Sequence, residues 1–209
     1  FVSIASHEFR TPLASISFAA ESIRNYFHQL SSKEIQQKLI KIEEQVSHMT
    51  NLLEDILTIG KSDAGQIKVK RVSLDLKEFI QSIIEEVQMP GKVKRIIYFN
   101  FNRVNAMANV DEKLLRNVTI NLLTNALKFS SENDPVTITI TDHKEGFLME
   151  VKDEGLGIDA GELQSVFEPF QRGSNVSNVQ GTGLGLSILK KAVDLMNGSI
   201  EVESELNKG

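Results

Sequence analysis

Residues 121–129 read Asn121-Leu122-Leu123-Thr124-Asn125-Ala126-Leu127-Lys128-Phe129, which combines the apolar residues of a packed helix with an unusual polar face. Spacings of four and three place Asn121, Asn125 and Lys128 on one side of that helix. A carboxamide oxygen is a suitable ligand for Mg²⁺, and an ammonium group can meet a phosphate. The segment by itself leaves two interpretations open, a metal and phosphate site or a solvated helix face.

Two glycine-containing segments favour the first interpretation. Asp153-Glu154-Gly155-Leu156-Gly157 follows a strand-like run. Its carboxylate can accept a hydrogen bond from an amino group such as that of adenine, and its glycines let a flat base approach the backbone. Gly181-Thr182-Gly183-Leu184-Gly185-Leu186 opens a helix, where backbone N–H groups attract an anion. It is not a Walker A loop, because no Gly-Lys-Ser/Thr follows, and residues 174–180 before it are a polar loop rather than the strand of a dinucleotide fingerprint.

The segments around these motifs predict an α+β domain. Asp75, with Glu78 three residues later, and Asp111 are expected to cap helices that end near residues 88 and 128. A third helix is expected over residues 184–196. Strands are predicted at residues 68–73, 96–101, 136–141, 147–153 and 200–204. Together these elements favour a sandwich in which a mixed sheet carries helices on one face.

The first sixty residues predict two long antiparallel helices with heptad seams. Ser32 is expected to cap the second helix. The seam positions are Val2, Ser6, Phe9, Leu13, Ile16, Ala20, Ile23, Phe27 and Leu30 in the first helix, and Ile35, Leu39, Ile42, Val46, Met49, Leu53 and Ile56 in the second. A lone hairpin leaves much of such a seam in water, so pairing into a four-helix bundle predicts a homodimer. The alternative is that the hairpin packs on its own C-terminal domain.

The polar run at residues 61–65, which ends in glycine, predicts a hinge. We therefore expect a helical hairpin over residues 1–62 and an α+β domain over residues 63–209.

His7 lies beside the first seam and is expected to face water. Glu8 can accept the Nδ1 proton of the imidazole and leave Nε2 as a nucleophile. Thr11 follows one turn after Glu8, where its hydroxyl could position a water. Pro12 interrupts the hydrogen bonding of a helix at this place, which predicts a kink. The spacing His-Glu-x-x-Thr excludes a zinc-protease helix.

The run His7-Glu8-Phe9-Arg10-Thr11-Pro12-Leu13 resembles the H box of the sensor histidine kinases of two-component signalling. The three later motifs, with Phe167-Glu168-Pro169-Phe170 between them, resemble the N, G1, F and G2 boxes of the GHKL ATPase superfamily. The resemblance implies a Bergerat-type ATP-binding fold. It also implies that His7 accepts the phosphoryl group, that Glu8 is its acid–base partner and that Thr11 positions water for a phosphatase reaction.

The same resemblance assigns the nucleotide site. It implies that Asn125 holds Mg²⁺, that Asp153 recognises the adenine amino group and that residues 171–180 form an ATP lid. The implied contacts with ATP come from Asn121, Asn125, Lys128, Phe129, Asp153, Gly155, Gly157, Ile158, Arg172, Gly181, Thr182, Gly183, Leu184 and Gly185.

Asn121 separates the branches of this superfamily. The chaperone and gyrase branch carries a water-activating glutamate at this place, and an amide cannot act as a base near neutral pH. The resemblance therefore implies autophosphorylation of His7 by ATP, then transfer to an aspartate of a response-regulator receiver domain. The alternative is a nucleotide-binding dimerisation module without kinase turnover.

Composition excludes several other classes of protein. The 209 residues contain no cysteine, which removes a disulfide framework and a thiol nucleophile. The net charge of −5 disfavours a broad nucleic-acid-binding surface. The apolar runs are shorter than a membrane span, so we expect no membrane contact from this stretch. It is expected to be a cytoplasmic piece of a longer protein.

Overall fold

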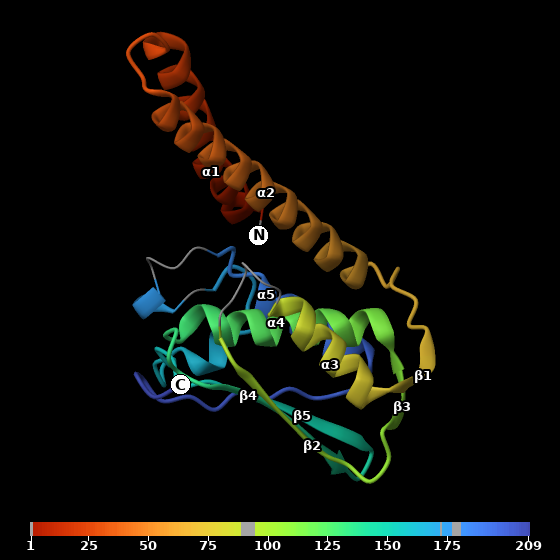
Figure 1. Ribbon diagram of the computed structural model, residues 1–209. Coiled ribbons are helices and arrows are strands. Elements are labelled where there is room, and N and C mark those ends of the chain that lie inside the picture. The colour runs from red at the N-terminus through yellow and green to blue at the C-terminus, as the bar shows by residue number, and fades with distance from the viewer. Residues whose placement is uncertain (1, 89–94, 172, 177–180) are drawn as a thin grey trace. The chain divides into compact units, whose positions relative to one another are not determined.

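The computed structural model describes residues 2–88, 95–171, 173–176 and 181–209. It divides into two compact units, Phe1–Ala64 and Gly65–Gly209 (Figure 1). The separation lies two residues after the boundary expected from the polar run, because the second helix continues through that run to Asp63.

The first unit is a helical hairpin formed by α1 (Val2–Tyr26) and α2 (Ser32–Asp63). Helix α1 continues through Pro12. The N-cap of α2 is Ser31 and not Ser32, so that prediction was wrong by one residue. The reason is Glu34, which lies three residues after Ser31: its backbone N–H donates to Ser31 Oγ (3.3 Å), and its carboxylate accepts the Ser31 N–H (2.8 Å). Three residues after Ser32 stands Ile35, which cannot reciprocate.

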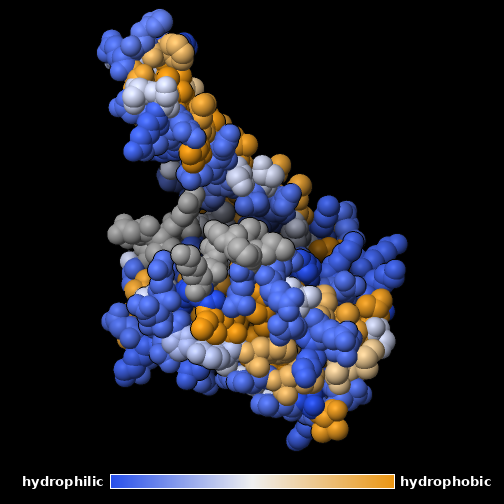
Figure 2. Space-filling model, in the orientation of Figure 1, coloured by the Kyte–Doolittle hydropathy of each residue, from blue (hydrophilic) through white to orange (hydrophobic). Residues whose placement is uncertain are grey.

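Each heptad seam divides into two halves. Phe9, Ile16 and Ile23 of α1 are partly buried, as are Ile35, Ile42, Met49 and Ile56 of α2. The alternate positions stay about half exposed, from 48% at Leu39 to 55% at Phe27, with Leu13, Val46 and Leu53 between them. Hydrophobic residues accordingly appear along the surface of the hairpin in Figure 2. An apolar stripe with a seven-residue repeat is thus left on each helix.

The second unit contains a mixed sheet, as predicted. Its strand order is β2-β4-β5, in which β4 pairs parallel with β2 and antiparallel with β5. A separate antiparallel pair joins β1 to β3. The strands are β1 (Arg71–Asp75), β2 (Ile97–Asn102), β3 (Met107–Asp111), β4 (Val136–His143) and β5 (Gly146–Lys152).

Three helices cover one face of this sheet, and two short 3₁₀ turns follow β5 (Figure 1). The core between the helices and the sheet includes the fully buried residues Leu76, Ile80, Leu123, Ile138 and Ile140. The helices are α3 (Leu76–Val87), α4 (Glu112–Phe129) and α5 (Gly185–Leu195), and the 3₁₀ turns are η1 (Leu163–Ser165) and η2 (Ser174–Val176).

Both predicted aspartate caps are present. Asp75 accepts the N–H groups of Lys77 and Glu78 at the start of α3. Asp111 accepts those of Lys113 and Leu114 at the start of α4, and also the N–H of Lys70. Burial raises the pKa of Asp111, but these three donors outweigh burial and hold the pKa below its ordinary value. The same carboxylate thus begins α4 and fastens the segment before β1.

Strand predictions differ from the structure at three places. The strand predicted at residues 68–73 begins three residues later, as β1 from Arg71, and runs to Asp75. Strand β3 was not predicted, because Met-Ala-Asn-Val-Asp is short and lacks a clear alternation. The predicted strand at residues 200–204 does not form in the described chain. Instead, the Ser204 hydroxyl donates to the Gly209 carbonyl (3.0 Å) and accepts the Ile158 N–H (2.8 Å), so this segment is held by side-chain and turn contacts.

Candidate functional site

His7 lies on the open surface of α1, with 71% of its side chain exposed. Its Nδ1 is 3.5 Å from Oε1 of Glu8, at the outer limit of a hydrogen bond. A carboxylate at Nδ1 fixes the tautomer in which Nε2 carries the reactive lone pair. The structure therefore presents an accessible imidazole whose nucleophilic nitrogen is on the side opposite its carboxylate partner.

Thr11 and Pro12 lie in the turn of α1 that follows His7. The Thr11 hydroxyl donates to the carbonyl oxygen of His7 at 3.4 Å. Pro12 is buried and has no N–H, so it cannot supply the helical hydrogen bond to the Glu8 carbonyl. His7, Glu8 and Thr11 therefore lie within one turn of helix, as the spacing predicted.

In the second unit, the polar face of α4 meets the glycine loop before α5. The Asn121 amide donates to the Asn117 carbonyl at 2.9 Å, and a Cβ on Gly185 would lie 3.1 Å from its Oδ1. A Cβ on Gly181 would lie only 2.5 Å from Nζ of Lys128. Only glycine fits at that position without displacing the lysine. Asn125 is partly buried between Asn121 and Lys128 on the same face.

The loop after β5 closes against the end of α4. The Gly155 N–H donates to Oδ1 of Asp153 (2.9 Å), and the Leu156 N–H donates to the carbonyl oxygen of Phe129 (3.0 Å). A Cβ on Gly155 would overlap that carbonyl group, so a side chain is excluded there. Gly157 has a φ of +61°, which favours glycine, and the Ile158 N–H is bound by Ser204.

Asp153 is a titratable group of this site whose pKa is shifted. Burial raises the pKa of its carboxyl group above the ordinary value. The Gly155 N–H and the charge of Arg95 lower it, while the charge of Asp134 raises it further. A partly buried carboxylate at the end of a strand can accept the amino group of a flat base in a water-poor setting.

The loop before α5 carries backbone donors and a strained contact. The Phe170 N–H donates to the Gly183 carbonyl at 2.9 Å, with both residues at positive φ (65° and 69°). The Leu184 N–H donates to Thr182 Oγ1 at 3.2 Å. Leu184, the N-cap of α5, has an apolar side chain that cannot bind the first N–H groups of the helix. These N–H groups suit an anion.

The structure thus gathers nearly all of the predicted nucleotide contacts in one unit. Arg172 lies outside the described residues, as do residues 177–180 of the expected lid. Arg95, whose guanidinium binds the end of α4, was not predicted, because a single arginine ahead of a strand belongs to no periodic pattern or motif.

Within the part of the chain that the structure describes, no helix is long and apolar enough to cross a membrane. Over the same residues, no group of three or more His, Cys, Asp or Glu side chains forms a metal cluster.

Comparisons with known proteins match both units. The family described as "His Kinase A (phospho-acceptor) domain" matches residues 1–65, and the family described as "Histidine kinase-, DNA gyrase B-, and HSP90-like ATPase" matches residues 110–209. The sensor protein KdpD of Clostridium acetobutylicum is 33% identical over 98% of this chain and 22% of its own length. The chain spans 22–41% of the length of the curated relatives it matches.

Two solved structures show the same architecture. Full-length ShkA in complex with AMPPNP has a TM-score of 0.68 and 26% identity, over 97% of this chain and 42% of that one. Histidine kinase ThkA in complex with the response regulator protein TrrA has a TM-score of 0.66 and 21% identity, over 94% of this chain and 55% of that one. The second likeness is one of fold. The α+β prediction is confirmed by these matches.

Proposed function

Because this chain belongs to the sensor histidine kinases, we propose that it transfers the γ-phosphoryl group of ATP to Nε2 of His7 and then to an aspartate of a response-regulator receiver domain. In the first step, a bond from Nε2 to phosphorus forms while the bond from phosphorus to the β–γ bridging oxygen breaks, and ADP leaves. Glu8 holds the proton on Nδ1 and stabilises the positive charge that develops on the ring. The observation that carries the proposal is the exposed His7 with Glu8 at its Nδ1.

The polar side chains on one face of α4 support this proposal. ATP would lie with adenine at Asp153, and its phosphates between Lys128 and the N–H groups of residues 182–185. The half-buried Asn125 amide fits a Mg²⁺ ligand on the same helix face as Lys128, and the ion would neutralise phosphate charge. Asn121 cannot abstract a proton from water. We infer that the γ-phosphoryl group of ATP is therefore transferred to the histidine and not to water.

We propose that the two units divide the work. The hairpin would be the dimerisation and phosphoacceptor domain, and the second unit the catalytic ATP-binding domain. The exposed seam halves support dimerisation, because Leu39, Val46 and Leu53 form a stripe that a second hairpin would bury. Dependence on ATP supports a cytoplasmic site of action.

The receiver partner follows from the chemistry of the product. A phosphohistidine is a high-energy phosphoryl donor. Because His7 is exposed, an acceptor group on another protein could reach it. ThkA, a histidine kinase of similar fold, was solved with a response regulator. We propose the same class of partner here. Thr11 would support the reverse phosphatase reaction by positioning a water close to the phosphohistidine.

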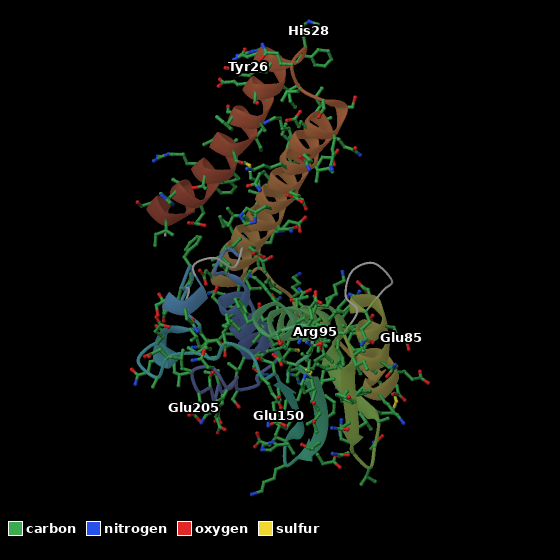
Figure 3. The ribbon with its side chains drawn as sticks, turned by 60° about the vertical axis from the view of Figure 1, so that its left-hand side comes forward. Tyr26, His28, Glu85, Arg95, Glu150 and Glu205 are labelled. Atoms are coloured by element: carbon green, nitrogen blue, oxygen red, sulfur yellow. The ribbon has the colours of Figure 1, made fainter. Side chains whose placement is uncertain are left out.

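The test is labelling with ATP that carries a radioactive γ-phosphate. We expect label on the protein that is labile in acid and stable in base, and that moves to an added receiver domain. The variant His7→Gln loses this label by at least about a hundredfold, as expected when the proposed nucleophile is removed. His28→Gln is the matched control, since His28 is also exposed and lies at the turn of the hairpin (Figure 3).

Two outcomes would contradict the proposal in different ways. ATP binding without any label would leave a nucleotide-binding dimerisation module. Label that persists in His7→Gln would place the phosphoryl group on another residue.

A further inference from the structure

Arg95 stands directly before β2, and only 9% of the residue is exposed. Figure 3 shows it inside the second unit beside α4. One terminal nitrogen, Nη1, donates to the carbonyl oxygens of Leu127 (2.6 Å) and Ser130 (3.2 Å). The other, Nη2, donates to the Ser130 hydroxyl (2.7 Å) and to the carbonyl oxygen of Asp134 (2.8 Å). The guanidinium therefore binds the last turn of α4 and the turn that follows it.

These contacts fit the needs of a helix end. The last carbonyl groups of a helix have no partner within the helix and carry the negative end of its dipole, so a cation is favoured there. The backbone of Arg95 is also held, because its carbonyl oxygen accepts Nε2 of Gln88 at 2.7 Å, just after α3. Arg95 thus joins the C-terminal ends of α3 and α4.

Stability alone is a poor explanation for this residue. A buried guanidinium costs desolvation energy, and an apolar side chain of the same volume is often as stable. Nε of Arg95 is buried and has no hydrogen-bond partner in the structure, which adds to the cost. The position of the charge therefore calls for a reason other than packing.

That reason lies in the residues of the last turn of α4, which Arg95 binds. It holds Lys128 and Phe129, and the Phe129 carbonyl accepts the Leu156 N–H of the loop after β5. Gly155 packs against the same carbonyl group, and its N–H binds Asp153. A displacement of the last turn of α4 would therefore displace the adenine loop with it.

We propose that Arg95 is a positioning residue for the nucleotide: its guanidinium fixes the last turn of α4 against the loop that carries Asp153. This inference rests on the proposed binding of ATP at Asp153. The pKa directions agree with it, because burial raises the pKa of Asp153 and Arg95 opposes that effect. Asp134 acts in the other direction, and its own carboxylate is occupied by the Ser131 N–H and hydroxyl.

The test is the pH dependence of MgADP binding to the full chain, measured by calorimetry for the wild type and for Arg95→Met. Ionised Asp153 accepts the adenine amino group, so binding weakens as acid protonates it. Without the guanidinium, Asp153 takes up its proton at higher pH, and the acid limb of binding moves to higher pH. The Kd for MgADP at neutral pH rises by about tenfold, because the loop that carries Asp153 loses its support and the hydrogen bond to the base weakens.

Inosine diphosphate provides the readout that a structural role would not change. Its base carries an oxygen where adenine carries the amino group. A protonated Asp153 can donate to that oxygen. In the acid range where the acid limbs of the two proteins differ, Arg95→Met therefore has a lower preference for ADP over inosine diphosphate than the wild type. Arg95→Lys keeps the charge but not the forked donors, and it restores the position of the acid limb even where its thermal stability stays reduced.

Arg103→Met is the matched control. Arg103 has only 9% of its side chain exposed and pairs with Asp142 at 2.9 Å. Thr137, near the start of β4, pairs with Lys152, the residue before Asp153. Asp142 lies at the opposite end of β4. This variant loses stability but keeps the acid limb of the wild type. An unchanged acid limb and base preference in both Arg95 variants would overturn the inference, whereas a wild type that binds no ADP would overturn the proposed function itself.

Discussion

Burial of Asp153 opposes the ionised form that the proposed recognition of adenine requires. Its carboxyl group is partly buried, and burial raises its pKa in the folded chain. A group whose folded pKa lies above its unfolded pKa stabilises the fold while protonated, and that contribution is lost as the pH rises through the folded pKa. The ionised form that can bind adenine is therefore the form that the fold tolerates less well.

Asp153→Asn should separate these two effects. We expect the Kd for MgADP to rise by about ten- to a hundredfold at neutral pH, because a charged acceptor is lost. The midpoint of thermal unfolding without nucleotide should rise by about 1–2 °C at neutral pH, and this gain should disappear in acid, where Asp153 is protonated. Calorimetric titration and thermal scans between acid and neutral pH measure both. A variant that binds as tightly as the wild type would remove Asp153 from the site.

Residues with a local motif could be predicted from the sequence, and residues without one could not. His7, Asn125 and Asp153 could be proposed as site residues because their neighbours at fixed spacing share one chemistry. Arg95 was missed because its partners at residues 127, 130 and 134 are backbone groups or a serine, more than thirty positions away in the sequence. Contacts to carbonyl groups leave no trace in side-chain patterns.

At the scale of single elements, the start of a helix depends on whether the residue three positions after the cap can return a hydrogen bond to it. The Ser31 and Glu34 pair forms a capping box at α2. The Ser31 hydroxyl and then its N–H lower the pKa of Glu34. The contribution of a carboxylate with a lowered pKa is present above its unfolded pKa and is lost as the pH falls through the folded pKa. The cap of α2 is thus strongest near neutral pH.

Ser31→Ala should lower the thermal midpoint of the hairpin by about 2–4 °C at neutral pH, the usual cost of a lost N-cap. The difference from the wild type should shrink in acid as Glu34 becomes protonated. Ser32→Ala is the control, because Ser32 already has helical geometry and should change the midpoint by less than about 1 °C. Circular dichroism across pH measures all three proteins. An equal loss in both variants would contradict the assignment of the cap.

The sequence predicted helices more reliably than the outer strands. The caps Asp75 and Asp111 are both correct, because capping depends on residues next to each other in the chain. A strand requires a partner, and the segment at residues 200–204 bonds through the Ser204 side chain instead. Strand β3 pairs with β1, which lies more than thirty residues earlier in the sequence, and it has too few apolar positions to be predicted from its pattern.

At the scale of the whole molecule, the exposed stripe on the hairpin predicts self-association. Val46→Asp introduces a charge between Leu39 and Leu53, one heptad away on either side. Burying an unpaired charge in a bundle is costly, so we expect the dimer to weaken by at least about a hundredfold. Sedimentation at micromolar concentration measures this.

Phe18→Ser is the matched control for that prediction. Phe18 is 71% exposed on α1 but lies outside the seven-residue repeat of the stripe. Its removal should leave the dimer intact. A wild type that remains monomeric, or a Val46→Asp variant that remains dimeric, would show that the stripe is not the dimer interface.

The end of α2 has a consequence for how quickly phosphoryl transfer can occur. The helix ends at Asp63, while Ile67 and Val69 already pack against α4 and α5. Residues 64–66 are left as a linker, which can span about 10 Å. Gly65 within it has a φ of +63° and open space around it. Under the proposed function, such a short linker ties the nucleotide-binding unit covalently to the hairpin that carries His7, which makes phosphoryl transfer an event within one assembly. Dilution of an assembled protein should therefore leave its rate of self-labelling almost unchanged.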